Sequence, residues 1–180
     1  MFAEVDVPAE LHEQVLRLHC EAWPDHGSHG HDPALRPLSM LLLREGRVVS
    51  ALDILSKDVH HRGDVYAASG LSTVVTDCAQ RGRGFGHRLV QAAYEEIGRR
   101  GAALGLFTCD PLLQPFYEEA GWRTLNGTVL IGGTPDHSLR SDHEGKITMG
   151  HFYSTHARSH AAEFIGALIA LYPGEIDKLW

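Results

Sequence analysis

The stretch from Ser72 to Gly86 decides the fold, and it reads S-T-V-V-T-D-C-A-Q-R-G-R-G-F-G. Its short β-branched run predicts the end of a strand, and the glycines that follow open a helical pattern. Glycines spaced by single residues let backbone N–H groups point into one concave nest, to which a helix adds the positive end of its dipole. The stretch therefore predicts a site that binds a phosphate group.

The composition indicates a globular protein with an acidic surface. The 180 residues are enough for one domain, 1–180, with its own hydrophobic core. A formal net charge of −7 argues against nonspecific nucleic-acid binding and suits a cationic substrate. Basic residues nevertheless surround the glycine-rich stretch, which indicates an anionic cofactor: Arg81, Arg83, His87, Arg88, Arg99 and Arg100.

The cysteines and the N-terminal residues bear on the cellular compartment. Cys20, Cys78 and Cys109 contain no C-x-x-C pair, so the sequence predicts neither a disulfide framework nor a zinc ribbon. The first residues lack the basic flank and apolar run of a signal peptide, and no apolar stretch reaches membrane-spanning length. We therefore expect a cytoplasmic protein with no membrane partner.

Hydrophobic periodicity predicts a helix and three strands before the glycine-rich stretch. Apolar residues from Leu11 to Ala22 share one helical face, and Trp23-Pro24 ends that helix. The runs Leu38 to Leu43 and Arg47 to Leu55 flank turn residues and should pair as a hairpin. A third strand, Val65 to about Thr76, is expected to continue the antiparallel arrangement.

The segments after the stretch predict a β-α-β crossover and a buried C-terminal helix. The helix after Gly84 ends near Gly101, and the next strand should lie parallel to the strand before the stretch through a right-handed crossover. The last expected helix, Ala161–Tyr172, is apolar on all sides and must therefore be buried or contact a second subunit. We therefore expect a homodimer. The remaining expected segments are a strand Ala102–Thr108, a helix Leu112–Ala120, a strand Trp122–Ile131, a polar loop Gly132–Gly145, a last strand Ile147–Tyr153 and this apolar helix, Ala161–Tyr172.

Two motifs at a characteristic spacing resemble those of the GNAT acyl-CoA-dependent N-acetyltransferases. Arg81-Gly82-Arg83-Gly84-Phe85-Gly86 matches the R-x-x-G-x-G signature of that family. About thirty residues later, Phe116-Tyr117-Glu118-Glu119-Ala120-Gly121-Trp122 is similar to its F-Y-x-x-x-G-F/W element. The likeness covers roughly Leu38 to Trp122.

The resemblance implies an α/β fold, with a mixed, mostly antiparallel sheet splayed at its centre and helices on both faces. It implies acetyl-CoA as cosubstrate, with a bulged strand whose Val74 N–H contacts the thioester carbonyl, and Tyr117 as the general acid. A phenol suits that role because its reference pKa of about 10 keeps it protonated at neutral pH. The residues implied to bind acetyl-CoA are Val74, Val75, Thr76, Arg81, Gly82, Arg83, Gly84, Phe85 and Gly86.

Within the family, the two ends of the chain look most similar to the aminoglycoside 2'-N-acetyltransferases. The likeness includes the tail Asp177-Lys178-Leu179-Trp180. Those enzymes carry a glutamate on the strand before the nest, where this chain has Ser72, so the general base is left open between Ser72 acting through ordered water, the Trp180 carboxylate, Asp25 and Asp53. The residues expected to contact the acceptor are Trp23, Asp25, Asp53, Thr108, Asp177 and Trp180.

The leading hypothesis is direct transfer of an acetyl group from acetyl-CoA to an amino group of an aminoglycoside-type antibiotic, which would confer resistance. The alternatives are another acceptor, namely a polyamine, an amino-acid-like metabolite or a protein N-terminus, and a noncatalytic acyl-CoA-binding module. The histidines at 26, 29 and 31 lie among glycines without a second ligand cluster, so the sequence predicts no metal site.

Overall fold

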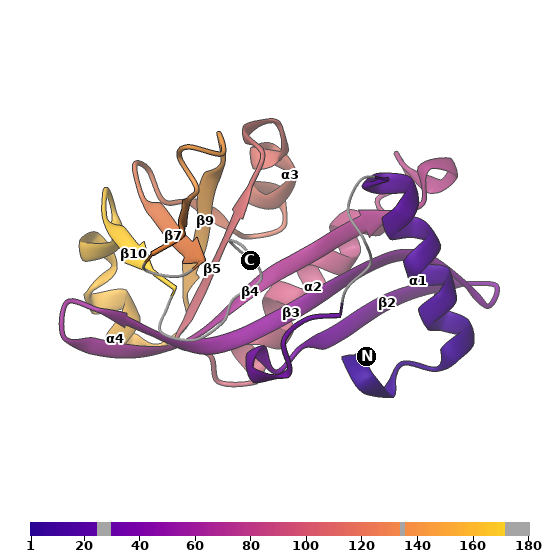
Figure 1. Ribbon diagram of the computed structural model, residues 1–180, viewed down its shortest axis with the longest axis horizontal. Helices are drawn as coiled ribbons and strands as arrows, with labels where there is room; N and C mark the ends of the chain where they lie inside the picture. Colours follow the sequence, from indigo (N-terminus) through magenta and orange to yellow (C-terminus); the bar gives the residue numbers. More distant parts are fainter. Residues whose placement is uncertain (25–29, 134–135, 172–180) are drawn as a thin grey trace.

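The computed structural model describes residues 1–24, 30–133 and 136–171, and it has the expected splayed sheet (Figure 1). Seven strands follow the order β1-β2-β3-β4-β5-β9-β6, and all their pairings are antiparallel except that of β4 with β5. Their bounds are β1 Phe2–Ala3, β2 Leu38–Arg44, β3 Arg47–His61, β4 Asp64–Thr76, β5 Leu104–Cys109, β6 Arg123–Thr124 and β9 Ile147–Phe152. The predicted antiparallel run of three strands is confirmed, with β3 six residues longer than expected at its C-terminal end.

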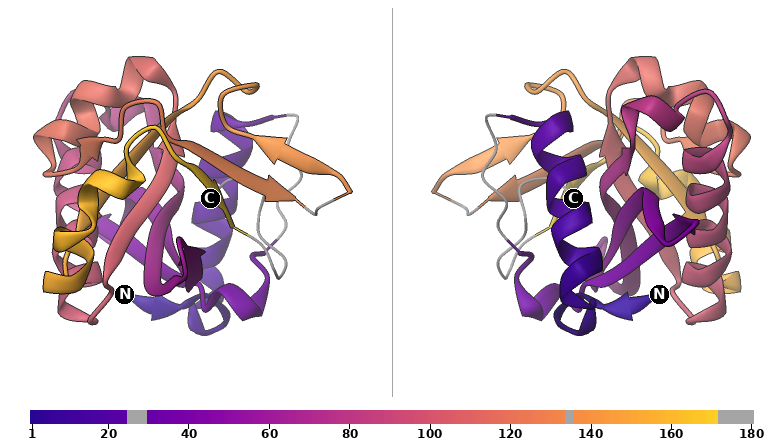
Figure 2. Two further views of the ribbon diagram at one scale, coloured as in Figure 1. Left: turned by 90° about the vertical axis from the view of Figure 1, so that its left-hand side faces the viewer. Right: turned by 90° about the vertical axis from the view of Figure 1, so that its right-hand side faces the viewer.

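Helices cover both faces of this sheet, as expected from the resemblance. Helix α1 (Ala9–Ala22) packs on one face through Leu18, which meets Val48 and Val75 in a small apolar cluster. Helix α2 (Phe85–Arg99) packs on the other face and buries Leu89, Ala93 and Ile97 in the main core. Figure 2 shows the two helices on opposite sides of the strands. Two shorter helices follow, α3 (Gln114–Glu119) and α4 (Thr155–Ser159).

The splay lies between β4 and β5. These strands pair in parallel at Ala68–Leu104 and Ser69–Gly105 alone, so the following residues of β4 have no partner on β5. Figure 1 shows the two strands diverging from this point. The β4-α2-β5 crossover predicted from the sequence therefore leaves an opening in the middle of the sheet.

The segment after α3 differs from its prediction. The expected strand Trp122–Ile131 is two strands, β6 in the main sheet and β7 (Val129–Gly133) in a second sheet, because the chain turns at Asn126-Gly127, where Gly127 has a φ of +70°. The expected loop Gly132–Gly145 contains β8 (Ser138–Arg140), which pairs antiparallel with β7. The predicted strand Ile147–Tyr153 is confirmed as β9, although it is not the last strand.

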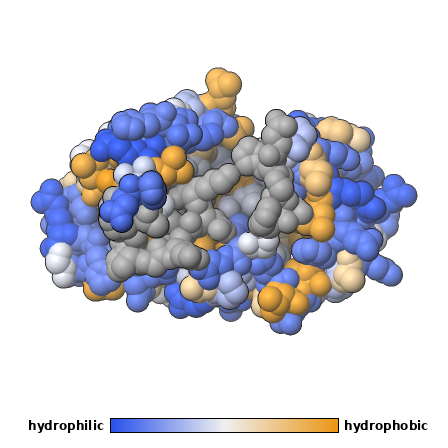
Figure 3. Space-filling view, in the orientation of Figure 1, coloured by the Kyte–Doolittle hydropathy of each residue, from blue (hydrophilic) through white to orange (hydrophobic). Residues whose placement is uncertain are grey.

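The helix predicted over Ala161–Tyr172 is wrong in the part that the structure describes. A 3-10 turn covers Ala161–Phe164, Gly166 has a φ of +67°, and β10 (Leu168–Ala170) pairs in parallel with β7. The apolar helix that suggested a homodimer is therefore absent from residues 161–171. Among the coloured residues of Figure 3, hydrophobic side chains form small groups within a largely hydrophilic face.

Across the described parts of the chain, none of the helices is both long and apolar enough to cross a membrane. The cytoplasmic location predicted from the sequence stays a prediction.

Candidate active site

A cavity of about 600 Å³ occupies the region of the splay, beside the C-terminal part of β4. It brings together the two motifs that the sequence singled out, the glycine-rich stretch and the Phe116-Tyr117 element. Trp23, at the end of α1, forms another part of the wall. The lining residues that were predicted as site residues are Trp23, Val74, Val75, Thr76, Arg81, Gly82, Gly84, Phe85, Gly86 and Tyr117.

The glycine-rich stretch forms the turn into α2 at one end of this cavity. Gly82 and Gly84 have φ values of +74° and +77°, a conformation that strains most other residues, so glycine is strongly favoured at both positions. Gly84 is the N-cap of α2, and because it has no side chain it cannot cap the helix itself. The first N–H groups of a helix have no partner within it and favour an anion. The local chain therefore fits a phosphate group.

Two further observations test whether these residues fit the nucleotide end and arm of acetyl-CoA. A Cβ at Gly86 would lie 2.7 Å from Oγ1 of Thr76, so only glycine leaves the helix this close to the strand. The side-chain oxygen of Gln80, which also lines the cavity, is buried and has no hydrogen-bond partner among the described residues. A bound polar molecule would supply a partner that the chain lacks.

The strand before the nest carries the expected bulge. The register between β3 and β4 shifts from Ala51–Val75 to Asp53–Ser72, which leaves one extra residue in β4. Thr73 sits at this irregularity with a φ of +50°. Thr73 lines a second cavity and Val74 lines the first, so the bulge marks the boundary between the two.

Tyr117 lies in the wall of the first cavity with its ring held by aromatic neighbours. Its ring centroid is 4.9 Å from that of Phe107 and 5.0 Å from that of Phe116, both with edge-on geometry. Burial, followed by the proximity of Cys109 and Asp110, raises the pKa of the Tyr117 phenol far above its ordinary value. The hydroxyl is therefore protonated across the physiological range and can donate a proton.

The second cavity, of about 110 Å³, is lined by polar side chains around Asp53. Asp53 is 6% exposed and accepts hydrogen bonds from Ser39 Oγ at 2.5 Å and from Thr73 Oγ1 at 2.6 Å. Ser39 contacts Oδ1, whereas Thr73 contacts Oδ2, and His31 Nε2 also lies 3.3 Å from Oδ2. Burial acts to raise the pKa of Asp53, but these three hydrogen bonds outweigh it, so the pKa is lowered and the buried carboxylate is ionised.

His19 is a feature of this cavity that the sequence analysis missed. It projects from α1 into the second cavity, and its Nε2 is buried without a hydrogen-bond partner among the described residues. Burial lowers its pKa from the model-compound value of 6.5, while the Asp53 charge acts in the opposite direction. The imidazole is therefore neutral at neutral pH. Its helical position offered no sequence signal, because an isolated histidine on an amphipathic helix is common.

The other predicted site residues divide into three groups. Ser72 is half-buried and lies across from Asp53 in the β3–β4 ladder. Arg83 is exposed, and neither Arg83 nor Thr108, which faces Thr148 on β9, lines either of the two cavities. Asp25, Asp177 and Trp180 lie outside the described residues, so the structure does not place them.

Comparison with known proteins identifies the family. The family described as "Acetyltransferase (GNAT) domain" matches residues 6–125, two thirds of the chain, and the chain belongs to it. None of the curated proteins matches.

Similar solved structures come from the same class of fold. ElaA from Escherichia coli is 17% identical with a TM-score of 0.59, over 83% of this chain and 95% of ElaA. An acyl-CoA N-acyltransferase from Pseudomonas aeruginosa is 20% identical with a TM-score of 0.57, over 81% and 92%. An aminoglycoside 6'-N-acetyltransferase in complex with coenzyme A is 12% identical with a TM-score of 0.57, over 83% and 94%. At these identities the likeness shows the fold alone.

Family and site together define an N-acetyltransferase that uses acetyl-CoA. When bound, acetyl-CoA supplies the activated acetyl group. The low identities do not extend the likeness to an acceptor, so the resemblance to the aminoglycoside 2'-N-acetyltransferases stays a prediction.

Proposed function

We propose that the protein transfers an acetyl group directly from acetyl-CoA to an amino group of a small cationic molecule of the aminoglycoside type. The observation that carries this proposal is the pair of cavities on either side of the β4 bulge, one lined by Thr73 and the other by Val74. The larger cavity, here the acetyl-CoA cavity, has the nest and the aromatic wall suited to that molecule. The smaller one, here the acceptor cavity, has two carboxylates, Glu4 and Asp53, in its lining.

The carboxylates favour an ammonium group as the acceptor. The ionised Asp53 is buried in a region of low dielectric constant, where its charge would attract a cation in addition to the three hydrogen bonds that it accepts. A cavity of about 110 Å³ takes one amino group with part of a ring, and the rest of an aminoglycoside would lie outside it. Acetylation would neutralise that amino group, which is how such a reaction would confer resistance to the antibiotic.

In the proposed mechanism, the chain positions one hydrogen-bond donor and two proton carriers. The Val74 N–H, at the bulge, would donate to the carbonyl oxygen where negative charge develops. The Tyr117 Oη would hold the proton needed by the leaving sulfur. In the acceptor cavity the neutral His19 Nε2 would take the proton released by the ammonium group.

His19 replaces the earlier candidates as the proposed base for a physical reason. Asp53 has a lowered pKa and three hydrogen bonds, so it is a poor proton acceptor, but its negative charge would stabilise a protonated His19 nearby. Ser72 would need an ordered water to act. Asp53 is accordingly proposed to bind the acceptor and to support His19.

A small polyamine or an amino-acid-like metabolite is a second candidate acceptor, which the small volume of the acceptor cavity favours. A panel assay of coenzyme A release distinguishes the candidates: aminoglycosides, polyamines, amino-acid-like amines and a peptide with a free N-terminus, each with saturating acetyl-CoA. Turnover with aminoglycosides at least about tenfold faster in kcat/KM than with the others is expected. Coenzyme A binding without turnover of any amine would instead support a noncatalytic acyl-CoA-binding module.

A further inference from the structure

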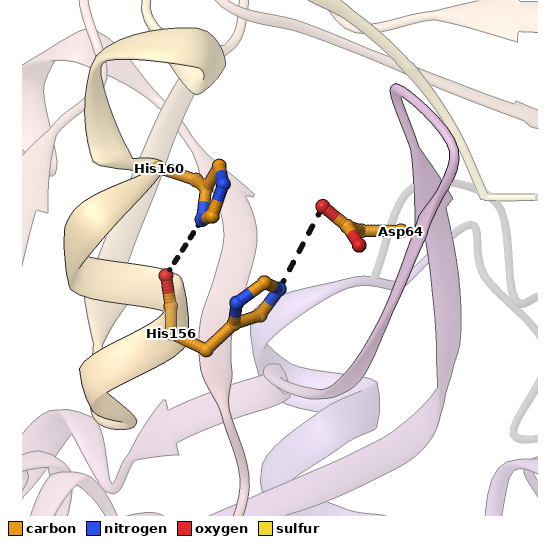
Figure 4. Close-up of side chains that lie close together, drawn as sticks. All are labelled: Asp64, His156 and His160. Carbon is orange, nitrogen blue, oxygen red and sulfur yellow. Dashed lines mark hydrogen bonds and ion pairs between the residues drawn. The ribbon is translucent and has the colours of Figure 1, made fainter.

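Three metal-ligating side chains from distant parts of the sequence meet at the end of the molecule opposite the nest. Asp64 begins β4, whereas Thr76 at the other end of this strand lines the acetyl-CoA cavity. Thirteen strand residues separate the two regions by roughly 40 Å. His156 and His160 come from α4 and the residue that ends it. Figure 4 shows the three side chains pointing toward one another.

The distances in this cluster fit a shared cation better than a simple ion pair. One ligand atom from each residue lies within 4.8 Å of the other two. His156 Nε2 is 3.7 Å from Asp64 Oδ2, which is long for a hydrogen bond. Two ligands bound at about 2.1 Å to a tetrahedral ion lie about 3.4 Å apart. The His156 and Asp64 side chains are 52% and 42% exposed, so they have room for the rotations that would bring the ligand atoms to this spacing.

The hydrogen bonding of His160 leaves one ring nitrogen available as a ligand. Its Nδ1 lies 3.0 Å from the backbone oxygen of His156, so Nδ1 carries the proton that is donated to that carbonyl. The lone pair is then on Nε2, the atom that Figure 4 shows on the side of Asp64. Metal-bound histidines commonly make this kind of bond through the other nitrogen, which fixes the tautomer and the ring orientation.

Tyr66 on β4 supports the ring of His156. The two rings stack with centroids 5.5 Å apart and an angle of 20°. Tyr66 is 1% exposed and also contacts Phe164 edge-on, so its own ring is held by the core. One ligand of the cluster is therefore positioned by a rigid side chain.

We propose that Asp64, His156 and His160 bind a divalent transition-metal cation, with Zn²⁺ the preferred ion for two imidazoles and one carboxylate. The cation would join the β3–β4 hairpin to α4, a segment beyond the residues that the family description matches. The expectation of no metal rested on the histidine-rich loop alone. His156 and His160 stand four residues apart, a spacing that can place two ligands on one helix face, but no local pattern links them to Asp64.

Isothermal titration of the chelator-treated full-length protein with zinc chloride tests the proposal. The wild type is expected to bind Zn²⁺, and His160→Ala and Asp64→Asn should each weaken that binding by about tenfold or more. His143→Ala removes an exposed histidine outside the cluster and serves as the matched control. Far-UV circular dichroism and coenzyme A binding check that each variant is folded, because neither depends on the cluster.

A second group, Glu4, His31 and Asp53, also has ligand atoms within 4.8 Å and must be distinguished. His31→Ala is therefore titrated in parallel, and Co²⁺ is used as a spectroscopic probe of imidazole ligation in every variant. Loss of the Co²⁺ absorption in His156→Ala and His160→Ala, with its retention in His31→Ala, supports the proposal. Absence of Zn²⁺ binding by the wild type, or binding that only His31→Ala removes, overturns it.

Discussion

Tyr117 and His19 line the two cavities on either side of the β4 bulge, and burial shifts the pKa of each so that it favours the protonation state that its proposed task starts from. Burial raises the pKa of the phenol, so Tyr117 keeps its proton. Burial lowers the pKa of the imidazole, so His19 stays without its second proton. One physical cause, the loss of solvent around a charged form, thus keeps Tyr117 protonated in one cavity and His19 neutral in the other.

Replacing Tyr117 with Phe removes the proposed acid and keeps the ring. We expect kcat to fall about 100-fold or more, since the departing sulfur loses its proton donor. Binding of coenzyme A should change little, because the aromatic contacts with Phe107 and Phe116 remain. Steady-state kinetics and calorimetry measure the two quantities. A variant with wild-type turnover would remove Tyr117 from the mechanism.

Replacing His19 with Gln tests the base through the pH dependence of kcat/KM. The wild type should lose activity as pH falls and His19 takes up a proton, and this should occur below 6.5 because the pKa is lowered. The variant should be slower at neutral pH and should lack this acidic decline. His143→Gln, an exposed histidine outside both cavities, is the control. An unchanged acidic decline in His19→Gln would assign the base elsewhere.

At the scale of elements, the β4-α2 turn was predictable because its information is local. Gly82 and Gly84 occupy positive φ angles that the sequence pattern indicates directly. The structure of the run from Ala161 to Leu171 was not predictable in this way. A continuous apolar stretch is compatible with a parallel strand as well as with a buried helix, and here it contains the strand β10. Here β10 gains a partner in β7, and this long-range pairing, with the turn at Gly166, decides against a helix.

Gly86→Ala tests the close approach of α2 to β4. The added Cβ would lie 2.7 Å from Thr76 Oγ1, so the helix start or the strand must move and distort the nest. We expect coenzyme A affinity to fall at least about tenfold, as poorly placed donors lose charge-assisted hydrogen bonds. Thr76→Ala in the same chain removes the clashing atom and should restore part of the affinity. A Gly86→Ala variant with unchanged affinity would show that the approach is not needed.

At the scale of the whole molecule, the proposed acceptor cavity could not be foreseen from the sequence because its parts come from separate elements. His19 belongs to α1, Asp53 to β3 and Thr73 to the bulge of β4. Asp53 was among the predicted residues, but its hydrogen-bond partners depend on strand register and helix docking. The nest differs because one continuous segment forms it, so chain order alone indicated its chemistry.

The overall charge makes a final prediction about the acceptor. A chain with a formal charge of −7 and carboxylates in the acceptor cavity should attract a polycation at long range. Added salt screens this attraction, since the Debye length shrinks to about 10 Å at 0.1 M ionic strength. We expect the KM of a cationic aminoglycoside to rise several-fold between roughly 0.02 and 0.3 M salt, with kcat nearly constant. A singly charged amine is the control and should respond less, because the attraction scales with the charge of the acceptor. Equal salt dependence for both amines would mean that the carboxylates do not select a polycation, and the aminoglycoside proposal would then lose its electrostatic basis.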